Sequence, residues 1–399
     1  MRRTAPGVRH GVVYHGVGVF RGPAAAARRP AAAAGEAQAT RAVQGTTMGS
    51  GFSLIGTAQW YSLGNKTFGR AGFEAARARW PAEPPPVTRL TVMVTGANAG
   101  LGFACAALLL RAHCEVHIVC RSRERGEAAL AALTAGAPPG GAGTVELHVA
   151  DVSSAASVRA FSAAWVARGA PLHALVLNAG VLPPALGVTE DGLEVGWATA
   201  MRQSYLLAGL LTPALLRGGA PGGRFARVIH VTSGGGLTVP LDVAGLAPPR
   251  PDKYNGTLWY ARAKRAQMVL AKLWATRLRG SGVWAASVHP GWADTEGVRT
   301  SLADFARERE GKLRTPEEGA DTIAWLALTE RLTEDLGGQL FFDREPAKQH
   351  FPMAGTDAGA AEAAKLWAAC AQQCGWVWEG SAEEAAVAAA RAGATPAAQ

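Results

Sequence analysis

A tyrosine and a lysine stand four residues apart in a stretch of helical character, Tyr260 and Lys264 in the sequence YARAK. Side chains at positions i and i+4 of a helix project from the same face, so both can reach one spot. A free tyrosine titrates near pKa ~10, and a neighbouring cation is expected to lower that pKa because it favours the phenolate. With the hydroxyl of Ser233 upstream, the pair predicts a general acid/base for carbonyl chemistry.

A glycine-rich turn, TGANAGLG at residues 95–102, follows an apolar β-type run at 90–94 and precedes an apolar helical pattern at 103–111. Strand, glycine turn and helix in this order are typical of dinucleotide binding, because the backbone can approach the pyrophosphate at the positive end of the helix. The alternative is a tight turn without a ligand. The residues expected to contact the dinucleotide here are Gly96, Asn98, Gly100, Leu101 and Gly102.

The next β-type run, 115–119, ends in the sequence CRS at 120–122. Dinucleotide folds that prefer NAD place a carboxylate near this point to bind the ribose 2′-hydroxyl, whereas an arginine suits a 2′-phosphate. Arg121, together with Arg123 or Arg125, therefore predicts NADP(H) in preference to NAD(H). The alternative is a solvated charge cluster that opens the helical stretch 123–133.

Taken together, these residues resemble the short-chain dehydrogenase/reductase family over roughly residues 88–345. The resemblance implies that Tyr260 gives its proton to the developing alkoxide, Ser233 hydrogen bonds the same oxygen, and Lys264 holds the nicotinamide ribose. The further cofactor contacts that it implies are Asp151, Val152, Asn178, Ala179, Gly180, Tyr260, Pro290, Gly291 and Thr295. Longer stretches at 255–261, 289–299, 319–328 and 341–346 are similar to one branch of that family, and 60–80 is similar to its N-terminal extension.

One position departs from the family pattern. Family members usually carry an asparagine on the helix after the Asn-Ala-Gly strand end, where it anchors a water chain from the lysine to solvent. Alignment places Ala200 at that position, and a methyl group cannot hold a water molecule. Gln203, one turn further on, is a candidate replacement.

The pattern along the chain predicts an α/β fold, a Rossmann-type doubly wound parallel sheet with helices on both faces in a single main domain. Strand-type runs lie at 90–94, 115–119, 145–149, 174–178, 227–232, 283–289 and 338–342. Helical patterns include 155–168, 190–217, 258–279, 316–329 and 357–378. We expect a leader at 1–48, an irregular amphipathic extension with a Pro-rich connector at 49–87, the catalytic domain at 88–345, and a C-terminal helix with a disordered tail at 346–399.

Composition narrows the class of protein further. No run of about 18 uncharged apolar residues occurs, so we expect no transmembrane segment, although aromatics such as Trp60 and Phe68 could pack on the core or touch a membrane surface. The five cysteines show no disulfide framework and no metal spacing. Cys370 and Cys374 are either free thiols or a redox pair.

The charge lies mainly in the leader. Residues 1–48 hold seven arginines and one acid, which supplies +6 of the formal net charge of +9 and leaves about +3 for the remainder. That balance argues against nucleic-acid binding. A leader rich in Arg and Ala and poor in acids predicts a transit peptide for a plastid or mitochondrion. A cytoplasmic protein with a mis-assigned start or a disordered tail is the alternative.

Two functions remain open at this point. The favoured one is an NADP(H)-dependent oxidoreductase (EC 1.1.1.-) that interconverts a carbonyl and an alcohol on a lipophilic small molecule, with Leu237, Trp259 and Trp292 lining an apolar cavity. The other is an NADP(H)-binding sensor or partner-binding protein on the same scaffold with little turnover, which Ala200 favours. Family habit suggests a homo-oligomer, and no metal is expected.

Overall fold

The central feature of the fold is a sheet that is parallel except at one edge. The computed structural model describes residues 51–81, 89–137, 143–220, 222–248 and 250–380. In these residues eight strands follow the order β3-β2-β1-β4-β5-β6-β7-β8, with only β8 antiparallel to its neighbour. The strands are β1 (Thr91–Thr95), β2 (Glu115–Cys120), β3 (Thr144–Val149), β4 (Ala174–Leu177), β5 (Ala226–Val231), β6 (Val283–Val288), β7 (Leu340–Phe342) and β8 (Glu345–Ala347).

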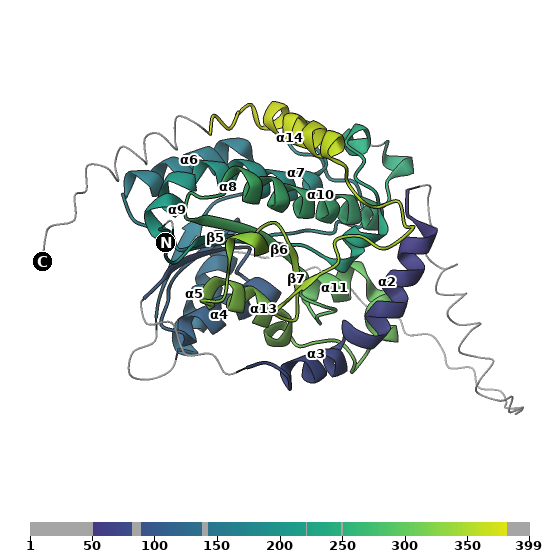
Figure 1. Ribbon diagram of the computed structural model, residues 1–399, viewed down its shortest axis with the longest axis horizontal. Coiled ribbons are helices and arrows are strands. Elements are labelled where there is room, and N and C mark those ends of the chain that lie inside the picture. The colour runs from purple at the N-terminus through teal and green to yellow at the C-terminus, as the bar shows by residue number, and fades with distance from the viewer. Residues whose placement is uncertain (1–50, 82–88, 138–142, 221, 249, 381–399) are drawn as a thin grey trace, which may run out of the picture. The chain divides into compact units, whose positions relative to one another are not determined.

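Helices cover both faces of this sheet. Figure 1 shows α6, α7, α8, α10 and α14 on one face and α4, α5 and α13 on the other. A separate hydrophobic cluster lies between the sheet and each of these two layers of helices. The helices are α4 (Gly100–Arg111), α5 (Arg123–Ala135), α6 (Ala155–Ala167), α7 (Val195–Met201), α8 (Ala208–Leu210), α9 (Thr212–Gly218), α10 (Gly256–Arg277), α11 (Glu296–Ser301), α12 (Ala303–Glu308), α13 (Pro316–Leu328) and α14 (Ala360–Cys374). The predicted doubly wound α/β fold is confirmed.

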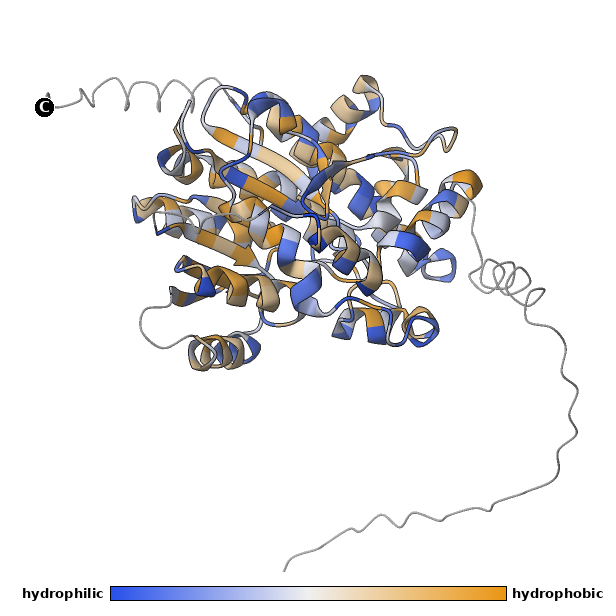
Figure 2. Cartoon of the chain, turned by 60° about the horizontal axis from the view of Figure 1, so that its bottom comes forward, coloured by the Kyte–Doolittle hydropathy of each residue, from blue (hydrophilic) through white to orange (hydrophobic). Residues whose placement is uncertain are grey.

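The central strands are mostly apolar, which Figure 2 shows as orange ribbon in the interior, with polar exceptions such as Arg227 and His230 in β5. All residues of β1 and β5 are buried. Parallel strands that are covered on both faces have this continuous apolar pattern. The seven predicted runs are all strands, whereas the three-residue β8 was not predicted.

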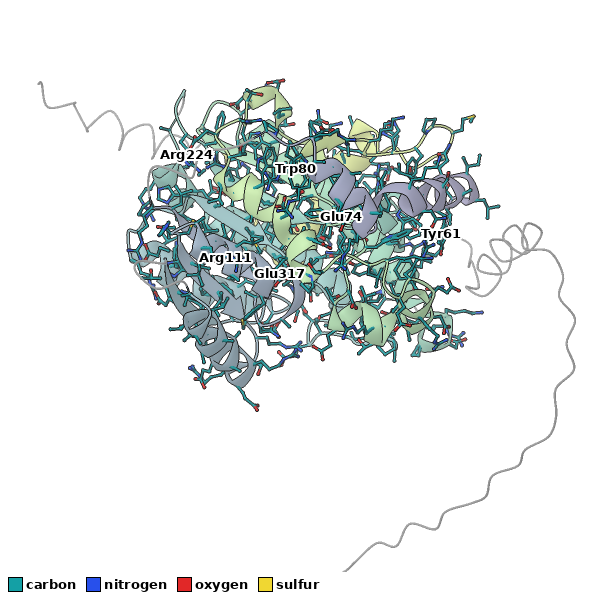
Figure 3. All side chains as sticks on the ribbon, turned by 90° about the horizontal axis from the view of Figure 1, so that it is seen from below. Tyr61, Glu74, Trp80, Arg111, Arg224 and Glu317 are labelled. Carbon is teal, nitrogen blue, oxygen red and sulfur yellow. The ribbon has the colours of Figure 1, made fainter. Side chains whose placement is uncertain are left out.

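The segment before the catalytic region is helical, contrary to the irregular structure that we expected. It forms α2 (Leu54–Thr67) and α3 (Arg70–Arg77). Gly56 and Gly64 do not interrupt α2, and both lie where the helix packs closely against other segments. If Gly64 carried a Cβ atom, that atom would lie 2.4 Å from the Trp292 ring, so glycine is needed for this contact. Figure 3 shows α3, which carries Glu74, beside the start of α13 near Glu317, and Arg70 pairs with Glu318 at 3.2 Å.

The C-terminal helix α14 packs on the face that carries α10. The indoles of Trp367 and Trp378 lie 5.0 and 4.9 Å from that of Trp274, and the Tyr205 hydroxyl donates to the Trp376 carbonyl at 3.2 Å. Cys370 and Cys374 are buried free thiols, as are the other three cysteines.

Several predictions concern residues outside the described part. The leader at 1–48, most of the Pro-rich connector and the tail at 381–399 are not among the described residues. Within the described part, no helix has both the length and the apolar character needed to cross a membrane.

Candidate active site

The predicted site residues come from the carboxyl ends of neighbouring strands. Gly96 follows β1, Asn178 follows β4, Ser233 lies two residues after β5, and Pro290 lies two residues after β6. β1, β4, β5 and β6 are consecutive in the sheet and parallel. Ligands of doubly wound sheets bind along this edge. The sheet therefore gathers segments that are far apart in the sequence.

The glycine turn is shaped by close backbone contacts. Gly96 has φ +66° and Gly100 has φ +56°, conformations that side chains disfavour. A Cβ on Gly102 would lie 2.4 Å from the Gly96 carbonyl oxygen and 2.5 Å from Asn178 Nδ2. The N-cap of α4, Ala99, supplies no side-chain hydrogen bond to the first turn of the helix. Its first N–H groups are thus available to an anion, which fits the predicted pyrophosphate.

Asn178 links the glycine turn to β4. Its Nδ2 donates to the Thr95 carbonyl at 2.9 Å and to the Gly96 carbonyl at 3.3 Å. The Thr95 hydroxyl accepts from the backbone N–H groups of Asn178 and Ala179 at 2.9 and 3.0 Å. The structure thus shows a positioning role for Asn178, while a cofactor contact from it stays a prediction.

The residues predicted at the adenosine end follow β2 and β3. Arg121 is exposed and, among the described residues, has no carboxylate partner. Asp151 Oδ1 instead accepts from the N–H and the hydroxyl of Ser153 at 2.8 and 2.7 Å, and Val152 is buried. Arg125 pairs with Glu296 at 3.3 Å, so Arg121 is the better placed of these two arginines for a phosphate.

The structure brings Ser233 and Tyr260 together. Ser233 is the N-cap of the short helix η2 (Gly234–Thr238), and Tyr260 lies in the first two turns of α10, which Asn255 caps. A hydrogen bond with Ser233 lowers the pKa of Tyr260, but burial has the larger effect and raises that pKa to about 12. The expected lowering of this pKa by Lys264 is not seen in this structure: the hydrogen bond with Ser233 is the one contact that lowers it, and desolvation outweighs that contact.

Lys264 is a buried cation next to this pair. Its Nζ lies 5.5 Å from the centre of the Tyr260 ring and donates to the Val231 carbonyl at 2.8 Å and to Gln267 Oε1 at 2.9 Å. It has no carboxylate partner among the described residues. Burial therefore lowers the pKa of the ammonium from its ordinary 10.5 to about 7. A Cβ on Gly180 would lie 3.3 Å from this Nζ, which places the Asn-Ala-Gly strand end beside the amine.

Gln203, the candidate replacement for the missing asparagine, binds elsewhere. Its Oε1 accepts from the Thr95 hydroxyl at 2.8 Å, and its Nε2 donates to the Ala179 carbonyl. It lies in the π-helix η1 (Arg202–Leu207), directly after the helix that carries Ala200. We therefore assign Gln203 to the glycine turn rather than to Lys264.

Gln267 and Ser204 take up the polar contacts around Lys264 instead. Gln267 is fully buried, its Oε1 accepts from Lys264 Nζ, and its Nε2 donates to the Ser204 hydroxyl at 3.1 Å. We did not predict either residue. The spacing of Lys264 and Gln267, one helical turn apart, was a usable signal, but their burial is not visible in the sequence.

The turn after β6 completes the arrangement of the site. Gly291 has φ +80°, and the Trp292 N–H donates to the Phe68 carbonyl of the N-terminal extension at 2.8 Å. Thr295 caps α11, and a Cβ on Gly100 would lie 3.4 Å from its methyl group. Pro290 to Thr295 thus run from β6 to the glycine turn.

The three side chains expected to line an apolar cavity are buried in hydrophobic clusters. Trp259 belongs to the core under α10, Leu237 packs with Met268 and Phe351, and Trp292 packs with Phe68. A further residue that we did not predict is His289, whose Nδ1 accepts from the Gly234 N–H at 3.0 Å. Burial lowers the pKa of His289 to about 3, so the ring is neutral and supports the backbone next to Ser233.

Known proteins agree with the fold and with the branch that the longer motifs indicated. Dehydrogenase/reductase SDR family member 12 of Bos taurus is 35% identical over 315 residues, covering 78% of this chain and 96% of the relative. The Homo sapiens protein of that name is 33% identical with similar coverage, 79% and 96%. Retinol dehydrogenase 11 of Homo sapiens is 34% identical over 63% of this chain and 76% of the relative.

A solved structure of an uncharacterised protein from Mycobacterium paratuberculosis superposes with a TM-score of 0.57 at 25% identity, covering 75% of this chain and 98% of that one. The family described as short chain dehydrogenase matches residues 90–305, more than half of the chain. Its fold binds nicotinamide cofactors, and the uncapped α4 and the glycine turn fit such a group. The chain belongs to the short-chain dehydrogenase/reductase family of oxidoreductases.

Proposed function

We propose that the protein is an NADP(H)-dependent oxidoreductase that interconverts a carbonyl and an alcohol on a lipophilic small molecule. The observation that carries the proposal is the convergence of Ser233, Tyr260 and Lys264 beside Gly180, at the carboxyl ends of β4 and β5. A hydroxyl, a phenol and an amine at one point are the groups needed to bind and protonate an oxygen atom.

The proton chemistry follows from the environment of Tyr260. Because burial raises the pKa of its phenol to about 12, Tyr260 is protonated at neutral pH and can donate to a developing alkoxide in the direction of reduction. Ser233, hydrogen bonded to the same phenol, stabilises the charge on that oxygen. A bound nicotinamide would supply or accept the hydride.

Lys264 is the group that would hold the nicotinamide ribose. Its pKa of about 7 means that the amine is readily neutralised at physiological pH, and an anionic dinucleotide nearby would favour the charged form. Gln267 and the Val231 carbonyl fix the amine beside Gly180 and Tyr260.

Arg121 supports the preference for NADP(H). It is exposed directly after β2 and, among the described residues, free of a carboxylate partner, so it is available to a 2′-phosphate. Substituting Arg121→Ala should weaken NADPH binding about tenfold or more and leave NADH binding nearly unchanged, measured by quenching of protein fluorescence. Arg217→Ala, which removes an exposed arginine of α9 that donates to the Ala170 carbonyl at 3.2 Å, is the control. Equal losses for both cofactors would contradict the assignment.

The lipophilic substrate is supported by the relatives and by the surroundings of the site. One relative is named retinol dehydrogenase, whose named substrate is a lipophilic alcohol. Leu237 follows Ser233 by four residues in η2, and Trp292 follows Pro290 by two, so residues of two hydrophobic clusters lie close along the chain to the predicted site residues.

The test is a panel of lipophilic aldehydes, ketones and alcohols, followed by NADPH absorbance. Turnover with the wild type and a loss of at least about a hundredfold in Tyr260→Phe would support the proposal. Tyr61→Phe, which removes a hydroxyl from α2, is the control for nonspecific effects. Cofactor binding should survive in Tyr260→Phe, and equal turnover by this variant and the wild type would refute the role of the phenol.

The sensor function has one specific observation in its favour, the methyl group of Ala200 where the family usually has asparagine. If NADPH binds with micromolar affinity and the whole panel remains unreacted, the sensor is the better description. Binding of neither cofactor would exclude both functions.

The location of the protein is a separate proposal. The basic, acid-poor leader at 1–48 is proposed to direct the chain to a plastid or mitochondrion. A fusion of residues 1–48 to a fluorescent protein tests this directly, and a diffuse cytoplasmic signal would contradict it.

A further inference from the structure

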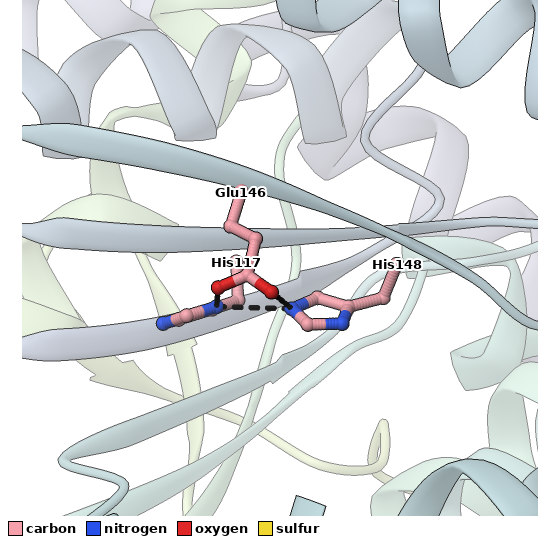
Figure 4. A group of neighbouring side chains, drawn as sticks. All are labelled: His117, Glu146 and His148. Atoms are coloured by element: carbon pink, nitrogen blue, oxygen red, sulfur yellow. Dashed lines mark hydrogen bonds and ion pairs between the residues drawn. The ribbon is translucent and has the colours of Figure 1, made fainter.

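A cluster of two histidines and a glutamate lies at the β2–β3 edge of the sheet (Figure 4), away from the proposed active site. His117 Nδ1 and His148 Nε2 are 3.0 Å apart. One Glu146 carboxylate oxygen lies 3.5 Å from His117 Nδ1, and the other lies 3.6 Å from His148 Nε2. β1 and β4 separate β2 from β5, the strand before Ser233.

The strand register explains why these residues meet. His117 of β2 is paired with Glu146 of β3, and His148 follows Glu146 by two residues. Side chains two residues apart on a strand project from the same face of the sheet. α6 covers this face, and the Trp165 ring contacts both imidazoles edge-on at 4.6 and 5.6 Å. Both histidines are buried, while the Glu146 side chain is half exposed, so the cluster is open to solvent on the carboxylate side.

The spacing of the three donors fits a small tetrahedral cation. Ligands that each lie ~2.0–2.1 Å from a tetrahedral Zn²⁺ are separated from one another by about 3.4 Å. The two nitrogens are 3.0 Å apart, and each lies 3.5 or 3.6 Å from its nearer Glu146 oxygen, close to that value. One donor atom from each of the three residues lies within 4.8 Å of the other two, so a small rotation of the carboxylate would bring one oxygen to both nitrogens. Two imidazoles and a carboxylate are also a ligand set that zinc commonly has in proteins.

A carboxylate lies near the outer ring nitrogen of His117. This nitrogen, Nε2, on the far side of the ring from the cluster, lies 3.4 Å from Glu115 Oε1. Metal-binding histidines usually donate their other ring N–H to a carboxylate, and Glu115 is close enough for that role, although its contact with Nε2 lacks hydrogen-bond geometry in this structure.

We propose that His117, Glu146 and His148 form a zinc site that joins the edge strand β3 to β2. Without a metal, the 3.0 Å contact is an ordinary hydrogen bond between two neutral imidazoles. Arg168 competes with the cation, because its guanidinium binds both oxygens of Glu146 at 2.9 and 3.2 Å. Exposed ion pairs are weak, so zinc can displace Arg168 from the carboxylate.

The experiment uses the full-length, untagged protein after removal of metal with a chelator. Zn²⁺ is titrated by calorimetry and Co²⁺ by visible absorption, since tetrahedral Co²⁺ absorbs strongly in the visible range. We expect one equivalent bound with micromolar or better affinity, and a rise in melting temperature of about 5 °C at saturating zinc. His148→Asn should lose this equivalent, and His350→Asn, which alters an exposed histidine, should keep it.

Two surface variants keep the test valid if His148→Asn does not fold. Glu146→Gln should weaken Zn²⁺ binding about tenfold or more, and Arg168→Gln should strengthen it several-fold because the competing cation is gone. The leader contains His10 and His15, so the readout is the difference from the wild type. The proposal would be overturned if the wild type bound no zinc at 0.1 mM Zn²⁺, which is roughly the weakest affinity of interest. It would also be overturned if Glu146→Gln bound zinc as tightly as the wild type, or if Arg168→Gln bound it more weakly.

Discussion

Lys264 makes the stability of the protein depend on pH in a way that one substitution can reveal. Its ammonium is buried without a carboxylate partner among the described residues, and its pKa is lowered from 10.5 to about 7. Between these two values the unfolded chain binds a proton at this position and the folded chain does not. The free energy of unfolding therefore rises with pH across this window and loses this contribution as pH falls toward 7.

The size of the effect follows from the two pKa values. The difference between 10.5 and about 7 corresponds to a penalty of roughly 4–5 kcal/mol at low pH, where Lys264 must be charged in both states. Between pH 7 and pH 9 about 2 kcal/mol of this penalty is relieved. Lys264→Met cannot titrate, so the wild type should gain about 2 kcal/mol relative to this variant over the same range.

Urea denaturation at three pH values between 7 and 9 measures this difference. The methionine also leaves the Val231 carbonyl and Gln267 without the amine, but that loss is independent of pH and cancels in the comparison. Lys272→Met, an exposed lysine on the same helix, is the control and should run parallel to the wild type. If Lys264→Met also runs parallel to the wild type, the buried amine does not have a lowered pKa and the electrostatic reasoning fails.

Three further outcomes are expected. Gln267→Leu should lower the free energy of unfolding by about 1–3 kcal/mol, because Lys264 and Ser204 each lose a buried hydrogen-bond partner. Gln267→Glu keeps an acceptor for Lys264, so its free energy of unfolding in the same urea denaturation assay should fall by less. Gly102→Ala should raise the Kd for NADPH at least about tenfold, since a Cβ would lie 2.4 Å from the Gly96 oxygen, whereas Gly297→Ala, with its nearest neighbour at 4.0 Å, should not. Because the pKa of Tyr260 is about 12, kcat/KM for alcohol oxidation should rise about tenfold per pH unit from pH ~7 to ~10, and a flat profile would refute the phenolate as the base.

The sheet could be predicted because its strands are buried on both faces and so have continuous apolar runs. The same signal fails for β8, which is three residues long and half exposed. The helix α2 was missed for a different reason. Gly56 and Gly64 weaken a helix in isolation, but here they permit close contacts with Ala354 and Trp292, and a single sequence does not show such contacts.

The candidate catalytic residues could be identified from the sequence, whereas their pKa values could not. The order of Ser233, Tyr260 and Lys264 placed them near one another, but the sign of the change in the pKa of Tyr260 depends on burial and was predicted wrongly. The cluster of His117 and His148 shows the opposite limit. These histidines are 31 residues apart and meet only because β2 and β3 pair in one particular register, which a sequence does not specify.

The polar contacts around Lys264 show how its amine is held although Ala200 stands where the family usually has an asparagine. A buried amine needs acceptors, and at this site they come from the strand carbonyl of Val231 and from Gln267, which is itself held by Ser204. All of these groups are protein atoms in fixed positions. Lys264 is thus oriented without the asparagine, so the methyl group of Ala200 removes an anchor for a water chain but not the support of the amine. The orientation of the amine therefore does not depend on a polar side chain at position 200 in this chain.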